Sequence, residues 1–178
     1  MLTLPGMDPR PAGAERLASQ SPAIRKDIVA AVAAVLGSAD HAVIARRAEA
    51  LAKLLDTDDG KNLLAGYRRA ADMIRIEETK EGVIYRGHPD PHLYLQREER
   101  ELAAGIHVAK QTAAQAVARE DFAAALHAIA ALTPRVDAFF AKVIVDVEMS
   151  DRRENRLRLL NEIREATRAV ADFSKIEG

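Results

Sequence analysis

The stretch that decides the fold is DRRENRLRLLNEIREATRAVADFS, residues 151–174. A helix advances about 100° per residue, and this spacing gathers apolar residues on one inward face: Leu160, Ile163, Thr167 and Val170. The opposite, solvated face carries Glu154, Arg158, Asn161 and Glu165. Arg152 and Arg156 fall on the inward face, at its N-terminal end. The segment therefore predicts a packed helix that carries two arginines where a core would have apolar residues.

These two arginines have two interpretations. An unpaired buried charge is costly, so the guanidinium groups can extend to water or pair with Asp137, Asp146 or Asp151. Alternatively, this end of the molecule is open and offers its arginines to an anionic ligand. Periodicity alone leaves both interpretations open.

Composition limits the class of protein. With 48% hydrophobic and 30% charged residues over 178 residues, the chain can fold as a globular domain. A net charge of −1 gives no overall basic signature, so nucleic-acid binding would need a local patch. Cysteine is absent, which excludes thiolate chemistry and suits a reducing cytoplasm. The sequence has no apolar run long enough to span a membrane, so no membrane partner is expected.

Turn and cap signals divide the chain into helices. Residues 1–20, rich in proline and glycine, are expected to be a flexible lead-in. The predicted helices run from Ser21-Pro22 to Gly37, from an Asp40 cap to a break at 57–60, from about Lys61 to Glu78, from about Leu93 to Ala118, from Asp121 to Leu132, from Thr133-Pro134 onward, and from near Ser150 to about Phe173. Short connections predict an all-α bundle of about six to eight helices with antiparallel neighbours. A short extended segment near residues 82–87 is an open alternative.

Basic residues recur along the third predicted helix. Lys61, Arg68 and Arg75 are seven residues apart and share one side, with Arg69 beside them and Asp72 among them. The structural interpretation is a solvated face on which Asp72 pairs with Arg68 or Arg75. The functional interpretation is an edge that follows a nucleic-acid backbone, with affinity that falls steeply with salt.

No self-sufficient active site is evident. His88 and His92 flank Asp90 in a proline-rich turn, but a zinc site needs three or four protein ligands, so no metal site is predicted. The sequence has no glycine-rich phosphate loop, no G-x-S-x-G and no H-E-x-x-H motif. We therefore expect no catalytic residues in this chain.

Several blocks together resemble a known family. They are residues 24–29, 45–51, 59–71, 74–78, 136–140, 153–157 and 170–174. In order and spacing they resemble the C-terminal region of the beta subunit of bacterial glycyl-tRNA synthetase, of the heterotetrameric type. The resemblance covers roughly residues 21–178 and is loose over 79–120.

The resemblance implies a division of the chain and a function. Residues 21–58 would be a helical pair from the end of a preceding HD-like region, and 59–178 an all-helical anticodon-binding domain of the type shared with arginyl-tRNA synthetase. The implied partners are glycine tRNA, the alpha subunit and the remainder of the beta subunit, with no DNA. The implied parent ligase uses ATP and magnesium, whereas this fragment would bind no cofactor and catalyse nothing itself.

The same resemblance suggests which residues contact RNA. They are Lys61, Arg68, Arg69, Arg75, Arg152, Arg153, Asn155 and Arg156. Arginine and lysine would contact phosphates or bases, and the Asn155 amide can donate and accept. Departures from the family pattern occur at Asp72, Ala141 and Ala166-Thr167. The alternative is a helical protein-interaction module that docks within the synthetase or on another partner without touching RNA.

Overall fold

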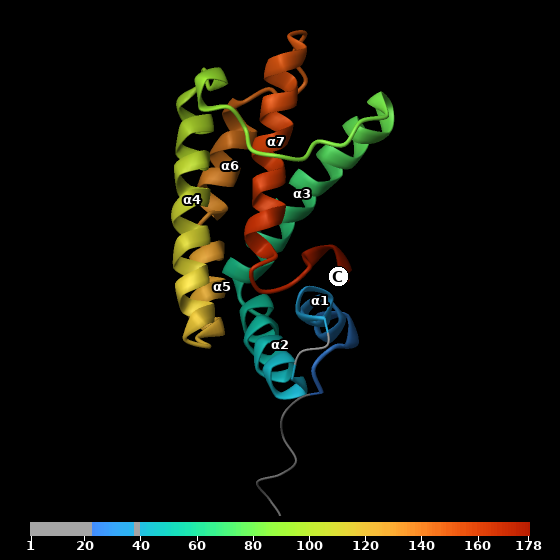
Figure 1. Cartoon of the computed structure of the whole chain (residues 1–178), viewed down its shortest axis with the longest axis vertical. Coiled ribbons are helices and arrows are strands. Elements are labelled where there is room, and N and C mark those ends of the chain that lie inside the picture. The colour runs from blue at the N-terminus through green and yellow to red at the C-terminus, as the bar shows by residue number, and fades with distance from the viewer. Residues whose placement is uncertain (1–22, 38–39) are drawn as a thin grey trace, which may run out of the picture.

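The computed structural model describes residues 23–37 and 40–178, and this part of the chain is all-α without a strand (Figure 1). The elements are α1 Lys26–Leu36, α2 His41–Leu55, α3 Asp58–Glu81, the 3-10 turn η1 Pro91–Leu93, α4 Arg97–Ala118, α5 Phe122–Ala130, α6 Thr133–Lys142, α7 Ser150–Thr167 and the 3-10 turn η2 Phe173–Lys175. The predicted all-α bundle is confirmed. The lead-in 1–20 and the predicted helix start at Ser21-Pro22 lie outside the described residues.

Helix α7 is the centre of the larger part of the bundle. It packs against α3 and α4, and α6 packs against both of those helices. In Figure 1, α3 and α6 run in the opposite direction to α7. The side chains of Leu157, Leu160 and Ile163 are at most 1% exposed. Asn161, expected on a solvated face, is also buried, because α7 has neighbours on more sides than a surface helix has.

A second core cluster joins α1 and α2 to the bundle. Leu51 of α2, Leu126 of α5 and Phe173 of η2 are fully buried within it. The chain after α7 turns back beside α1, where the Asp172 amide donates to the Ala31 carbonyl over 2.8 Å. One continuous cluster thus contains residues from both ends of the described chain.

The junction of α2 and α3 differs from the prediction. Residues 57–60 were expected to break the second helix, with the third starting near Lys61. Instead, α3 starts at Asp58, because the Thr57 hydroxyl accepts a hydrogen bond from the Gly60 amide over 3.1 Å. The predicted Asp40 cap is confirmed by its bond to the Ala42 amide.

The segment between α3 and α4, residues 82–96, crosses over α7 and is called the strap below (Figure 1). Gly82, with a φ of +68°, ends α3, and no extended strand forms in the described strap. Helix α4 begins at Arg97 rather than near Leu93, since Gln96 and Glu99 form a capping box. Helix α7 ends at Thr167, before the predicted Phe173, which instead begins η2.

Candidate nucleic-acid interface

Arg156 is held inside the bundle. Its side chain is 6% exposed, its Nε donates to Glu99 Oε1 over 2.8 Å, and its Nη1 donates to the Ile144 carbonyl over 2.5 Å. The predicted aspartate partners are therefore wrong for this residue. The partner lies in α4, far away in sequence, which periodicity within one helix cannot show.

The surroundings of Glu99 favour its ionised form. Burial alone would raise its pKa, but hydrogen bonds from Arg156 and from the backbone amides of Gln96 and Leu95 outweigh this and lower it. The ion pair of Arg156 and Glu99 thus joins α7 to the first turn of α4. Both charged groups also form hydrogen bonds with the backbone.

The next two polar residues of the closing segment are also occupied. Arg153 donates to Glu81 Oε1 over 2.5 Å, and its Nη1 lies 3.9 Å from Asp146 Oδ1. Asn155 is 3% exposed, accepts from the Asp90 amide over 2.6 Å and donates to the Asp90 carbonyl over 3.0 Å. These bonds fasten the strap to α7. Arg153, Asn155 and Arg156 thus form hydrogen bonds within the fold, which supports a structural role, and their predicted contacts with RNA stay a prediction.

We expect Asn155→Leu to loosen the strap. The substitution leaves the amide and carbonyl of the exposed residue Asp90 without their side-chain partner, and each lost hydrogen bond costs about 0.5–1.5 kcal/mol net. Hydrogen exchange should accelerate in the strap, residues 82–96, more than in α5. Unchanged exchange at Asp90 would contradict this role.

The basic stripe of α3 does not form one continuous free edge. Arg68 donates to the carbonyls of Ile176 over 2.9 Å and Gly178 over 2.7 Å. Arg69 lies 4.2 Å from the ring centroid of Phe140. Arg75 pairs with Asp72 at 3.4 Å, which confirms the structural interpretation of Asp72. Lys61 is exposed in the first turn of α3.

A groove of about 340 Å³ opens where α6 ends and α7 begins. Apolar side chains of its wall face solvent: Leu95 is 51%, Ile144 70% and Met149 48% exposed. Lys142 and the half-buried Arg152 supply positive charge and Glu148 a single negative one, and among the described residues neither Lys142 nor Arg152 forms an ion pair. We call this the end groove.

The end groove combines aliphatic surface, against which bases can pack, with cations that can contact phosphates, and its described lining holds no aromatic ring. The sequence indicated Arg152 and the possibility of an open end, but it did not single out Lys142, Leu95, Ile144 or Met149. The missed signal was the pair of large apolar residues in the connection between α6 and α7, a segment that ought to be polar.

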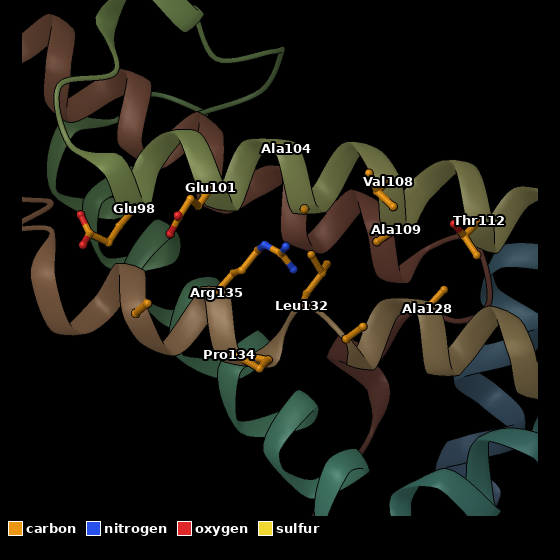
Figure 2. Close-up of a pocket in the computed structure, with 13 residues that line it drawn as sticks. Glu98, Glu101, Ala104, Val108, Ala109, Thr112, Ala128, Leu132, Pro134 and Arg135 are labelled. Atoms are coloured by element: carbon orange, nitrogen blue, oxygen red, sulfur yellow. The ribbon is translucent and has the colours of Figure 1, made fainter.

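A second, larger groove of about 700 Å³ runs between α4 and the α5–α6 pair (Figure 2). Small and apolar residues line most of it, and Val108 is 59% exposed. Figure 2 shows Glu98 and Glu101 near one end and the Arg135 side chain directed toward α4. Carboxylates at this rim disfavour a phosphate backbone.

The histidine turn is part of the strap and does not gather metal ligands. His88 Nδ1 lies 3.1 Å from Glu162 Oε1. Within residues 23–37 and 40–178, no three histidine, cysteine or carboxylate side chains cluster as a metal site would require. In the same residues, no helix is long and apolar enough to cross a membrane.

Comparison with known proteins shows the domain family to which the chain belongs. Residues 63–173 match the family model of the DALR anticodon binding domain, which spans α3 to η2 of this bundle. The chain belongs to the DALR anticodon binding domain family.

Whole proteins similar to this chain show which members of the family it resembles. The chain is 43% identical over 164 residues to the glycine–tRNA ligase beta subunit of Rhodospirillum centenum, which covers 92% of this chain and 23% of the relative. It is 44% identical over 154 residues to the beta subunit of Phenylobacterium zucineum, covering 86% and 23% respectively. These matches confirm the predicted resemblance. The chain spans less than a quarter of the length of the curated relatives it matches.

Proposed function

We propose that this chain is the anticodon-recognition part of a glycine–tRNA ligase beta subunit. The observation that carries the proposal is the match of residues 63–173 to the DALR anticodon binding domain. In the parent enzyme, the chain would hold the anticodon loop of glycine tRNA while glycine is activated elsewhere with ATP and magnesium, together with the alpha subunit. The domain itself would contribute binding and no catalytic group.

The end groove is the surface that we assign to the anticodon loop. Leu95, Ile144 and Met149 offer apolar area against which unstacked bases can lie, and Lys142 and Arg152 can contact phosphates. Arg156, paired with Glu99, forms part of the groove lining and holds its wall in place, but its charge is balanced by that carboxylate. Of the residues first predicted, Arg152 therefore remains the leading candidate, with Lys61 and Arg69 as further exposed cations.

We expect Lys142→Gln and Arg152→Gln each to weaken binding of glycine tRNA, and to do so about equally for any anticodon. Each removes one phosphate contact, so the slope of log affinity against log salt should fall by about one. Fluorescence anisotropy over a salt series measures this. Arg119→Gln, at the other end of α4, is the matched control and should leave the slope unchanged.

A docking module is the second candidate function, favoured by the groove between α4 and the α5–α6 pair. Its small side chains and exposed Val108 suit a helix from the rest of the beta subunit or from the alpha subunit. The two functions use different grooves, so a binding measurement can distinguish them. If wild-type chain fails to bind glycine tRNA even at low salt, the anticodon proposal is wrong for this chain and docking is the better account.

A further inference from the structure

The groove of about 700 Å³ between α4 and the α5–α6 pair, called the side groove below, has an apolar interior that is open to solvent (Figure 2). Leu132 lies in its lining, and Val108 on the α4 wall is 59% exposed. On α4, the lining from Ala104 to Thr112 carries no charged side chain. The exposed face of a surface helix is normally polar or charged, so this part of α4 is built like a face that another element covers.

Arg135 places one free cation in the middle of the side groove. Its side chain lies across Gly105 of α4, where an added Cβ would come within 2.5 Å of Arg135 Cδ. Arg135 is exposed, and among the described residues its guanidinium forms no ion pair and no hydrogen bond. A guanidinium binds a carboxylate through two parallel hydrogen bonds. The groove therefore offers a position for one acidic side chain of an otherwise small and apolar partner.

The charges at one end of the groove restrict the partner further. Glu101 pairs with Arg97, whereas Glu98 forms no ion pair with the described residues. Glu98 repels a phosphate backbone but can pair with a basic side chain of a protein. From Glu98 to Thr112, α4 rises about 21 Å, which matches a partner helix of roughly 14 residues.

Geometry and chain length favour a helix of the same polypeptide over a second copy of this chain. In a two-fold dimer the same patch meets itself, and two concave grooves facing each other would leave both unfilled. The chain covers 22–23% of the glycine–tRNA ligase beta subunits that it matches, so most of such a protein lies outside it. A covalently joined segment has a high effective concentration, so it needs less buried area than a separate partner.

We propose that the side groove is the docking site for a helix from another part of the same beta subunit. The helix presents small apolar residues to Val108 and Leu132 and a carboxylate to Arg135. This inference rests on the proposed function, since it takes the chain as one part of a longer beta subunit. The contact attaches the anticodon-binding bundle to the remainder of the subunit through a surface that RNA does not use.

Photo-crosslinking in the parent protein, expressed from its own gene, tests the docking. The crosslinking residue benzoylphenylalanine replaces Val108 in one variant and Gln111 in the control. Gln111 is exposed on α4 and lies outside the groove lining. We expect Val108→benzoylphenylalanine to crosslink, within one polypeptide, to a segment outside residues 1–178, which mass spectrometry identifies. The Gln111 variant should not give this product.

Arg135→Gln tests the carboxylate that the inference assigns to the docked helix. Combined with the crosslinker at position 108, it should lower the crosslink yield by about threefold, as the loss of one exposed ion pair does. Arg119→Gln, at the C-terminal end of α4 and outside the groove, is the matched control and should leave the yield unchanged. All four positions are exposed, so each variant should fold, which circular dichroism checks.

The outcomes separate docking from anticodon recognition, because binding of glycine tRNA is measured on the same protein. Crosslinks from Val108 only to this chain's own residues, to the alpha subunit, to a second copy or to RNA overturn the proposed occupant. An unchanged yield in Arg135→Gln overturns the assigned carboxylate. If the crosslink within the subunit forms but the protein binds no glycine tRNA, the RNA-binding proposal fails and the docking site stands.

Discussion

Arg156→Met is expected to destabilise the fold by about 3–5 kcal/mol, because it leaves the Glu99 carboxylate buried without its charged partner. Methionine retains much of the arginine's apolar length and leaves little empty space. The lost free energy of unfolding therefore comes mainly from the broken ion pair and not from a cavity. Glu99 keeps two backbone donors, from Leu95 and Gln96, but Oε1 loses Arg156. Urea unfolding followed by circular dichroism measures the change.

The matched control lies two residues further along α7. Arg158 pairs with Glu154 at the half-exposed surface, and such pairs are worth less than about 1 kcal/mol. Arg158→Met should therefore have a small effect. The double variant Arg156→Met with Glu99→Gln should recover part of the loss, since no buried charge remains without a partner.

The effect of Arg156→Met should depend on pH in a specific direction. In the wild type the folded-state pKa of Glu99 is lowered, so its stabilising contribution is present above the unfolded value of about 4.3 and is lost as pH falls through the folded value. Without Arg156, burial raises the pKa of Glu99, so protonation of this carboxylate stabilises the folded variant. The difference between the two proteins should thus be largest near pH 7 and shrink toward pH 4. A difference that stays constant over this range would show that the loss is one of packing alone.

How far the sequence predicted this structure depends on whether the deciding contacts were local. The Asp40 cap and the inward face formed by Leu160, Ile163, Thr167 and Val170 were predicted, because each follows from spacing within one helix. The start of α3 was misplaced, since Thr57 can either end one helix or cap the next, and only the closeness of α2 decides it.

The site was predicted less well than the fold. Arg152 was found because it breaks a pattern, but Glu99, Asp90 and Glu81 lie on other elements, so the sequence could not show that they occupy Arg156, Asn155 and Arg153. Glu99 gave no sequence signal at all, because a charged residue in a helix is ordinary until its surroundings close over it.

Gly60→Ala is expected to cost about 3 kcal/mol, at the upper end of the range for overpacking or beyond it. A Cβ at this position would lie 2.0 Å from the Leu54 carbonyl oxygen, a backbone atom that cannot rotate away. The Thr57 hydroxyl, which donates to that same carbonyl and accepts from the Gly60 amide, would be displaced too. Alanine would otherwise favour a helix by up to about 1 kcal/mol, so destabilisation here would reverse the usual sign.

Gly66→Ala tests whether the α2–α3 junction, rather than α3 itself, causes the loss. It has the same propensity gain in the same helix, but its added Cβ meets only a methyl of the Val136 side chain, at 3.3 Å. Thermal unfolding of the two variants should differ clearly, with Gly66→Ala within about 1 kcal/mol of wild type. Hydrogen exchange should then rise in α1 and α2 of Gly60→Ala, because their packing against α5 and η2 depends on this close turn. Equal stability of the two glycine variants would mean that α2 can shift away from α3, and the close contact would lose its role in joining the first two helices to the anticodon-binding bundle.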